Sequence, residues 1–375
     1  MAHRGKLKVV ELYAGTGRSV EPFRFWRSAE VSLLVDVNKH AARVYAHNFP
    51  KARYLVENLS LLSADRLAAE AGGRVDILLG CPPCQGFSDN GLRRATDSRN
   101  AHITRFREYV QRLKPLAVAM ENVPLAAASG RFKILTEELE RNGYRWTATI
   151  ANAALWGSCQ SRQRLILVAI KKGSGTAPVF PTVTHGAGKY FNYSKHGMYK
   201  IREDYVSMLG VTPGTFRVAG LLPENHLNEI GPKNIPTLNE VIGDLPPVDS
   251  RDGKRIGHFS WAHTPTVLAR MREVREGGRW EGGSDHYSQT YGRLHRKGLA
   301  RTITTYFPNP GSGRYWHPTQ NRALTLREAA RIQGFPDTFE FVGEHPSFNC
   351  SLVGNALDRT LANITYRIIR NSLED

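Results

Sequence analysis

A short apolar run that leads into a proline-rich loop constrains the fold of this chain more than any other stretch. Residues 77–79 (Ile-Leu-Leu) have the pattern of a buried parallel strand, and Gly80 with the proline pair at 82–83 cannot continue a central strand. In open α/β sheets, ligands bind just beyond the carboxyl ends of the strands. The loop presents Cys84 at such an end, so we interpret Cys84 as a candidate nucleophile rather than as a small buried hydrophobe.

The cysteines allow two other interpretations of this loop. Cys81 and Cys84 form a C-x-x-C pair, which occurs in redox proteins and in metal sites. A metal site needs further ligands, and the other two of the four cysteines, Cys159 and Cys350, are isolated, so we expect no bound metal. A thioredoxin-like motif opens a helix, whereas prolines and a long loop follow here; a redox pair remains an alternative. Four scattered cysteines also predict a protein of the reducing cytosol.

A glycine turn follows the first expected strand. Residues 8–13 (Lys-Val-Val-Glu-Leu-Tyr) read as that strand, and residues 14–17 (Ala-Gly-Thr-Gly) as a turn into a helix, where the backbone can approach a ligand closely. A second expected strand, 31–36, ends in Asp36, about twenty residues after the turn, where an acid can bind ribose hydroxyls. A helix N-cap is an equally good interpretation of Asp36 from the sequence alone.

Two further polar motifs belong to the same part of the expected sheet. The apolar strand 116–120 ends in Glu121, which would be a candidate acid or base beside the nucleophile. Between two later strands, the alternation in residues 160–164 places Gln160, Arg162 and Arg164 on one face. Such a face suits an anionic or polarised group.

The charge of the chain favours a polyanionic partner. The net charge is +17, from 51 Lys and Arg against 34 Asp and Glu. Residues 286–327 contain no acidic side chain, and basic and aromatic residues alternate there, which suits contacts to phosphates and bases. Residues 87–107 are polar and rich in arginine, so we expect a mobile loop there that closes on nucleic acid.

The sequence predicts two domains. The composition changes near residue 173. From there to residue 325, Gly, Pro, Thr, His and Tyr are frequent and the hydrophobic residues show little periodicity. We expect a catalytic and cofactor-binding domain at 1–172, a second domain at 173–345 and a C-terminal segment, 346–375, that returns to the first. Helices are expected at 39–49, 59–71, 132–141, 324–333 and 352–369, with a Thr325-x-x-Glu328 capping box, and further strands at 54–56, 144–150 and 165–170.

The sequence contains no feature of a membrane or secreted protein. No stretch of 18 apolar residues occurs, and the first residues lack the apolar core and cleavage site of a signal peptide. We therefore expect a cytoplasmic protein, associated with the nucleoid if the source is prokaryotic.

Taken together, these motifs resemble those of the cytosine-C5 DNA methyltransferases, which use S-adenosylmethionine. Seven motifs occur in the family's order, at residues 13–17, 36–37, 80–88, 121–123, 160–164, 326–337 and 354–356. The resemblance implies a Rossmann-like class I methyltransferase sheet, mostly parallel with one antiparallel strand, and a smaller irregular target-recognition domain. It also implies restriction-modification as a biological setting.

The resemblance assigns roles to particular positions. It implies that Cys84 adds to C6 of a flipped cytosine and that the methyl group passes to C5, leaving S-adenosylhomocysteine. The implied catalytic residues are Cys84, Glu121, Arg162 and Arg164; the cofactor-binding residues are Tyr13, Ala14, Gly15, Thr16, Gly17, Arg18, Asp36, Val37, Asn58, Leu59, Pro82, Asn355 and Ala356; the DNA-binding residues are Gln85, Ser88, Arg99, Arg301, Thr302 and Arg314.

The implied partner is double-stranded DNA with a specific cytosine-containing site, bound by a monomer, with a cognate restriction endonuclease as a further candidate partner. A branch of the family methylates transfer RNA instead, but it typically carries a Cys-Phe-Thr string, and no cysteine lies between Cys159 and Cys350. A catalytically inactive DNA-binding relative is the other alternative. The chain departs from the family's usual residues at Arg18, where a second glycine is usual, and at Asn58, His102 and Asp358.

Overall fold

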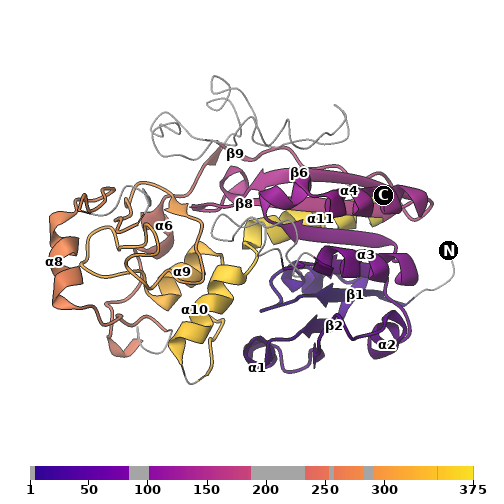
Figure 1. The fold of residues 1–375 in the computed structure, drawn as a ribbon, viewed down its shortest axis with the longest axis horizontal. Helices are drawn as coiled ribbons and strands as arrows, with labels where there is room; N and C mark the ends of the chain where they lie inside the picture. Colours follow the sequence, from indigo (N-terminus) through magenta and orange to yellow (C-terminus); the bar gives the residue numbers. More distant parts are fainter. Residues whose placement is uncertain are drawn as a thin grey trace.

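The computed structural model describes residues 5–83, 101–186, 233–252, 257–282, 290–343 and 345–374. Within them, one large sheet and its helices form one side of the molecule, and a group of short helices and loops forms the other (Figure 1).

A seven-stranded sheet forms the first part, with the strand order β3-β2-β1-β4-β5-β8-β6. Strand β8 pairs antiparallel with both of its neighbours, β5 and β6, and the remaining pairs are parallel. The predicted class, a mostly parallel sheet with one antiparallel strand, is confirmed. The strands are β1 (Leu7–Leu12), β2 (Ala29–Asp36), β3 (Tyr54–Val56), β4 (Ile77–Gly80), β5 (Ala117–Asn122), β6 (Tyr144–Asn152) and β8 (Gln163–Lys171).

Helices cover both faces of this sheet because its central strands are apolar on both sides. Val10 and Leu78 face one core cluster, whereas Val9 and Ile77 face the other. The first cluster is closed by α2 (Ala64–Glu70), α3 (Ala101–Leu113) and α4 (Gly130–Arg141), and the second by α1 (Lys39–Asn48), α11 (Arg359–Glu374) and the 3-10 helices η1 (Glu21–Phe25) and η4 (Ala153–Trp156). The result is a three-layer α/β/α arrangement.

A separate core holds the second part together. It includes Leu238, Ile303 and Phe335, and it also takes in Ala41 and Val44 from α1. Thr325 and Glu328 form the predicted capping box at the start of α9. The elements here are α6 (Leu238–Ile242), α8 (Pro265–Glu273), α9 (Leu326–Ile332) and α10 (Pro346–Asn355), with the two-residue strands β7 (Gln160–Ser161), β9 (His185–Gly186), β10 (Lys233–Asn234) and β11 (Ala300–Arg301). The 3-10 helix η3 (Pro124–Ala128) belongs to the first part, because Ala126 and Ala127 pack in its first core cluster.

Three expectations about helices were wrong, each for a local reason. Helix α2 begins at Ala64 rather than at 59, because the Ser63 side chain caps it. The last helical stretch is two helices, because Ala356 is extended and the Asp358 carboxylate accepts from the Thr360 N–H to start α11. Residues 101–107, expected in a loop, lie in α3, whose buried positions 103, 106 and 110 keep a helical spacing despite the surrounding charges.

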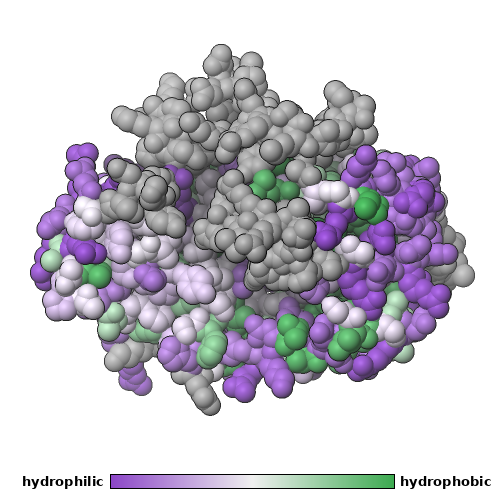
Figure 2. All heavy atoms as spheres, in the orientation of Figure 1, coloured by the Kyte–Doolittle hydropathy of each residue, from purple (hydrophilic) through white to green (hydrophobic). Residues whose placement is uncertain are grey.

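The region expected to lack periodicity also contains the short helices α6 and α8. Hydrophilic residues cover much of the described surface on the face in Figure 2, with small separate hydrophobic patches between them. In the parts of the chain that the structure describes, no helix combines the length and the apolar character of a membrane span.

Gly80 tests how tightly the first core is packed. An added Cβ there would lie 2.5 Å from the Phe106 ring, which is fully buried. We expect Gly80→Ala to lower the free energy of unfolding by about 1–3 kcal/mol, as overpacking does. Gly130→Ala, at a position with open space in α4, is the matched control. Urea unfolding curves check this, and equal stability of the Gly80 variant and the wild type would contradict it.

Candidate active site

The strand order reverses between β1 and β4. The chain passes from β1 outward to β2 and β3, and then returns to place β4 on the other side of β1. A crevice forms at such a reversal, at the carboxyl ends of the strands. Leu12 pairs with Gly80 and Gly80 with Met120, so the residues that follow them, Tyr13, Cys81 and Glu121, lie at the same level of the sheet, with Glu121 near the end of β5. The structure thus brings three predicted motifs to one edge.

The glycine turn after β1 is held in one shape. Tyr13, Gly15 and Gly17 all have positive φ angles, and a Cβ on Gly17 would clash with the Tyr45 ring at 2.3 Å. The Gly15 N–H donates to Asp36 Oδ2 at 3.0 Å, and the Tyr54 hydroxyl donates to the Gly15 carbonyl at 2.8 Å. A glycine is therefore required at position 17, where both the φ angle and the lack of space exclude a side chain.

The groups around the turn fit an adenosyl ligand. Asp36 is not the helix cap that its sequence also allowed, because Asn38 caps α1. The Val37 side chain beside it is 68% exposed although it is apolar, and Asn58 is exposed as well. The buried Thr16 hydroxyl has no hydrogen-bond partner among the described residues. A carboxylate, an apolar surface and an unused hydroxyl suit a ribose, an adenine and a polar tail, respectively.

A buried acid beneath the turn was missed by the sequence analysis. Glu11 on β1 is 1% exposed, and its Oε2 has no hydrogen-bond partner among the described residues. Burial raises the pKa of the Glu11 carboxyl to about 8, partly offset by a hydrogen bond from Ser19. An acid between the apolar residues Val10 and Leu12 was the available signal, because an acid is seldom buried without a reason.

Glu121 and Arg164 form the polar centre of this edge. Arg164 Nε lies 2.9 Å from Glu121 Oε1, and the two side chains are 16% and 15% exposed. Asn122, which follows Glu121 on β5, donates from Nδ2 to the Pro82 carbonyl at 3.1 Å and so holds the base of the proline loop. Cys84, Gln85, Ser88 and Arg99 lie outside the described residues.

Cys81 faces inward from the same loop. Its Sγ lies 3.6 Å from the Ser19 hydroxyl. Burial, together with the nearby Glu121 carboxylate, raises the pKa of the Cys81 thiol well above its ordinary value. Cys81 therefore remains a neutral thiol at neutral pH, and a neutral thiol is a poor nucleophile.

Arg162, the other arginine of this motif, contacts the second part of the molecule. It is 2% exposed, and its guanidinium donates to the carbonyls of Ile303, Gly354 and Ala356 at 3.0–3.2 Å. Burial lowers the pKa of Arg162 to about 9. Arg162 therefore joins the segment after β11 to the end of α10. Arg164 is the arginine that contacts Glu121.

The neighbouring Gln160 makes a second connection of this kind. Its Nε2 donates to Gln333 Oε1 at 2.9 Å and to Asp358 Oδ2 at 3.1 Å, and its Oε1 accepts from the Ile303 N–H at 2.7 Å. Asp358, one of the departures from the family pattern, thus has a defined place: its carboxylate also accepts from the Ser158 hydroxyl at 2.7 Å.

The predicted DNA-binding residues of the second part lie near this junction. Arg301 pairs through its backbone with Ser161, and the Thr302 hydroxyl donates to the Ser161 carbonyl at 2.9 Å. Arg314 donates to the Gly277 carbonyl at 2.8 Å, and burial and the like charges of Arg301 and Arg279 lower its pKa. Arg279 and Arg301 therefore lie close enough to Arg314 to repel it.

The remaining predicted site residues occupy varied positions. Leu59, Pro82 and Ala356 are buried, Asn355 is exposed at the end of α10, and His102 contacts the Tyr13 hydroxyl through Nδ1 at 3.3 Å. The side chain of Arg18 points away from the turn, and its Nη2 donates to the Gly334 carbonyl at 2.8 Å.

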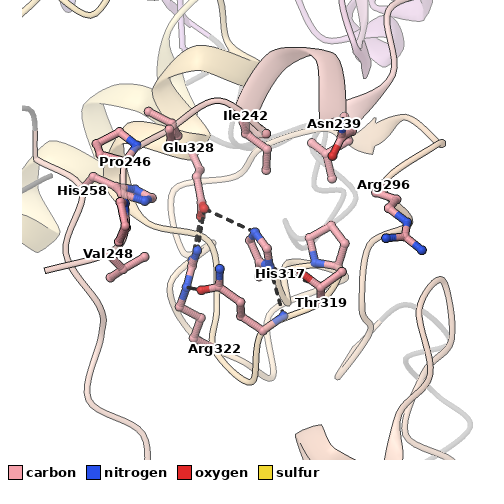
Figure 3. A pocket seen from close by; sticks show the side chains of 16 residues that line it. Asn239, Ile242, Pro246, Val248, His258, Arg296, His317, Thr319, Arg322 and Glu328 are labelled. Atoms are coloured by element: carbon pink, nitrogen blue, oxygen red, sulfur yellow. Dashed lines mark hydrogen bonds and ion pairs between the residues drawn. The ribbon is translucent and has the colours of Figure 1, made fainter. Parts of the chain in front are cut away.

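A cavity of about 410 Å³ in the second part contains none of the predicted site residues. Figure 3 shows Glu328, Arg322 and His317 converging within it; Arg322 Nη2 lies 2.6 Å from Glu328 Oε1 and His317 Nε2 lies 3.6 Å from the same atom. Burial lowers the pKa of His317 to about 4, although Glu328 opposes this. These side chains satisfy one another and stabilise the capped start of α9.

Comparison with known proteins decides the family. The family model described as C-5 cytosine-specific DNA methylase matches residues 7–370. The chain belongs to this family. Type II methylase M.HgiDII of Herpetosiphon aurantiacus is 25% identical, over 98% of this chain and 96% of that protein. Type II methyltransferase M1.HphI of Haemophilus parahaemolyticus is 28% identical, over 95% of this chain and 84% of that protein.

Solved structures agree in fold. DNMT2 of Spodoptera frugiperda superposes with a TM-score of 0.64 at 17% identity, covering 97% of this chain and 100% of the other. The methyltransferase EhMeth of Entamoeba histolytica also gives 0.64, at 14% identity and 98% coverage of both chains. This member of the C5 cytosine methylase family is thus a DNA (cytosine-5-)-methyltransferase with the class I fold.

Glu11 makes stability depend on pH. The pKa of Glu11 rises from an ordinary 4.5 to about 8 on folding, because the folded protein favours the neutral carboxyl. The contribution of this protonation to the free energy of unfolding is therefore complete below pH 4.5 and is lost as the pH rises through about 8. Glu11→Gln stays neutral, so we expect the variant to gain stability over the wild type across this window, by up to about 1.4 kcal/mol per pH unit. Urea unfolding from pH 5 to 9 measures it. Parallel curves would contradict the prediction, and Glu30→Gln, on the partly exposed Glu30 of β2, is the control.

Proposed function

We propose that this chain transfers a methyl group from S-adenosylmethionine to C5 of a cytosine in a specific double-stranded DNA sequence and releases S-adenosylhomocysteine. The observation that carries the proposal is the strand register: Leu12, Gly80 and Met120 are neighbours, so the glycine turn and the proline-cysteine loop begin at the level of Glu121 near the end of β5. A methyl donor and a base held at this edge would meet at the loop that carries Cys84.

S-adenosylmethionine, when bound, supplies an electrophilic methyl group on a sulfonium sulfur. The residues of this chain that would hold it surround the turn. The Asp36 carboxylate binds the ribose hydroxyls, the exposed Val37 packs on the adenine and Asn58 faces its amino group. The proposed contacts also include Tyr13, Ala14, Gly15, Thr16, Gly17, Leu59, Pro82, Asn355 and Ala356.

Cys84 would be the nucleophile of the reaction. Its thiolate adds to C6 of the cytosine while Glu121 hydrogen-bonds the exocyclic amine and gives a proton to N3. The C6–S bond and the N3 proton give C5 the character of an enamine, which allows C5 to take up the methyl group. C5 then loses its proton to solvent water, the C6–S bond breaks to release the Cys84 thiolate, and N3 returns its proton to Glu121.

Arg164 supports this role for Glu121, because its Nε lies 2.9 Å from Glu121 Oε1. An arginine in this place keeps the carboxylate oriented toward the base. Arg162, buried against three carbonyls, would act by fixing the junction beneath the base rather than by touching it.

The DNA would bind between the two parts of the chain. The reacting atoms of a cytosine are inaccessible inside a duplex, so the base is extruded from the stack. We assign residues 1–172 to catalysis, 173–345 to target recognition in the major groove and 346–375 to the return segment. Arg301, Thr302 and Arg314, with Gln85, Ser88 and Arg99, are the proposed DNA contacts.

The biological setting follows from the relatives. M.HgiDII and M1.HphI carry the name of type II methylases, so we infer a restriction-modification role with a cognate endonuclease, in the cytoplasm and as a monomer. Transfer RNA is the second candidate substrate, because the resemblance includes a branch of the family that methylates it, but no cysteine lies between Cys159 and Cys350 to match that branch's Cys-Phe-Thr string.

Bisulfite sequencing tests the chemistry and the substrate together. Plasmid DNA from cells that express the wild type should contain protected cytosines in one fixed sequence context, and DNA from cells that express Cys84→Ser should contain none. Cys350→Ala, which changes a buried cysteine far along the chain, should preserve the protection. Unprotected DNA from wild-type cells would contradict the DNA proposal and favour RNA or an inactive binder.

The acid has its own test. Glu121→Gln should lower kcat by about 10²–10⁴-fold, the usual contribution of general acid catalysis, because the amide cannot protonate N3. Incorporation of a labelled methyl group into the identified site measures kcat, and titration with S-adenosylhomocysteine should give an unchanged Kd. Glu137→Gln, an acid on the exposed side of α4, is the control. A kcat within twofold of the wild type would remove Glu121 from the mechanism.

A further inference from the structure

Arg18 connects the glycine turn to a segment 316 residues further along the chain. Its Nη2 donates to the Gly334 carbonyl at 2.8 Å, and its guanidinium lies 4.3 Å from the centre of the Phe335 ring. Glu21, three residues on, forms an ion pair with it. The side chain is 2% exposed, so these contacts are made away from water.

Position 18 does not need a glycine in this chain. Tyr13, Gly15 and Gly17 take the positive φ angles of the turn, whereas Arg18 does not have a positive φ angle. The arginine nevertheless carries an electrostatic cost. Burial, and then the like charge of Arg359, lower its pKa to about 9, and its Nε has no hydrogen-bond partner among the described residues. A buried ion pair of this kind seldom stabilises a protein more than apolar side chains of similar volume would, so stability alone does not account for Arg18.

The segment that Arg18 holds leads to the proposed DNA contacts. Gln333, next to Gly334, accepts from Gln160, and Gln160 accepts in turn from the Ile303 N–H at 2.7 Å. Phe335 shares a buried core with Ile303. A continuous set of contacts therefore runs from the turn to the residue that follows Thr302.

The segment has no room to move independently of Arg18. Gly334 has a φ of +79°, and a Cβ there would lie 2.6 Å from the Arg359 Cβ at the start of α11. The Arg359 N–H donates to the Gln333 carbonyl at 3.3 Å. The peptide at 333–334 is thus held between Arg18 on one side and α11 on the other.

We propose that Arg18 is a positioning residue that makes cofactor binding and DNA binding mutually dependent. A ligand that fixes the turn also fixes Arg18, and through Gly334 and Phe335 it fixes the surface that carries Thr302. The inference rests on the proposed function, since it requires a cofactor at the turn and DNA at that surface. Coupling of this kind is reciprocal, so DNA must tighten the cofactor by the same factor as the cofactor tightens DNA.

The test is the dissociation constant of S-adenosylhomocysteine measured with and without a duplex that carries the site found by bisulfite sequencing. For the wild type, DNA should tighten binding by about 5–50-fold, within the usual range of coupling between sites. Arg18→Met keeps the length of the side chain and removes the guanidinium, so the ratio should fall to within about twofold of unity. A split in steady-state kinetics should accompany it: the KM for DNA rises by about tenfold, and kcat falls much less.

A matched control and a second variant make the test decisive. Arg24→Met removes an arginine that stacks on Phe49 within the sheet side of the molecule, and the coupling should survive. If Arg18→Met does not fold, Phe335→Leu removes the stacking partner instead and should reduce the ratio. A wild-type ratio retained in either folded variant overturns the inference, as does a wild type that binds both ligands without coupling. A wild type that binds neither ligand overturns the proposed function itself.

Discussion

The reversal of strand order between β1 and β4 is the constraint on which the site depends. Because β1 pairs with both β2 and β4, the order of the strands runs in opposite directions from β1 and from β4, and ligands bind at such a reversal in open α/β sheets. The register then sets the levels. Leu12, Gly80 and Met120 lie side by side, so the turn, the proline loop and Glu121 begin at the same height.

Buried polar side chains connect the sheet to the second part of the molecule. Arg162 binds three backbone carbonyls, Gln160 joins Gln333 to Ile303, and Arg18 reaches Gly334. Each group is almost fully buried, so a lost partner would leave a desolvated polar atom. Such contacts specify one relative placement of the two parts more sharply than apolar packing does, because hydrogen bonds depend on direction.

Electrostatics separate the two acids at the crevice. Glu121 lies against Arg164, whereas burial raises the pKa of Glu11 to about 8. Two carboxyl groups of one sheet, on β1 and β5 with β4 between them, therefore experience different environments. The same logic separates the cysteines of the loop: burial keeps Cys81 in its thiol form, which leaves the chemistry proposed here to Cys84.

The sequence by itself determined the family, the fold class and the motifs that meet at the sheet edge. Strand periodicity, glycines and prolines are local signals, so the turn at 14–17 and the capping box of Thr325 and Glu328 were predictable from neighbouring residues. Only the tertiary structure decided that Arg162 is buried against backbone carbonyls and that Arg18 stacks on Phe335. The same holds for Asp358, which accepts hydrogen bonds from Ser158 and Gln160. These contacts join residues far apart in the chain, and a long polar side chain can reach any of several partners, so its role depends on which surface the fold brings within a few ångströms.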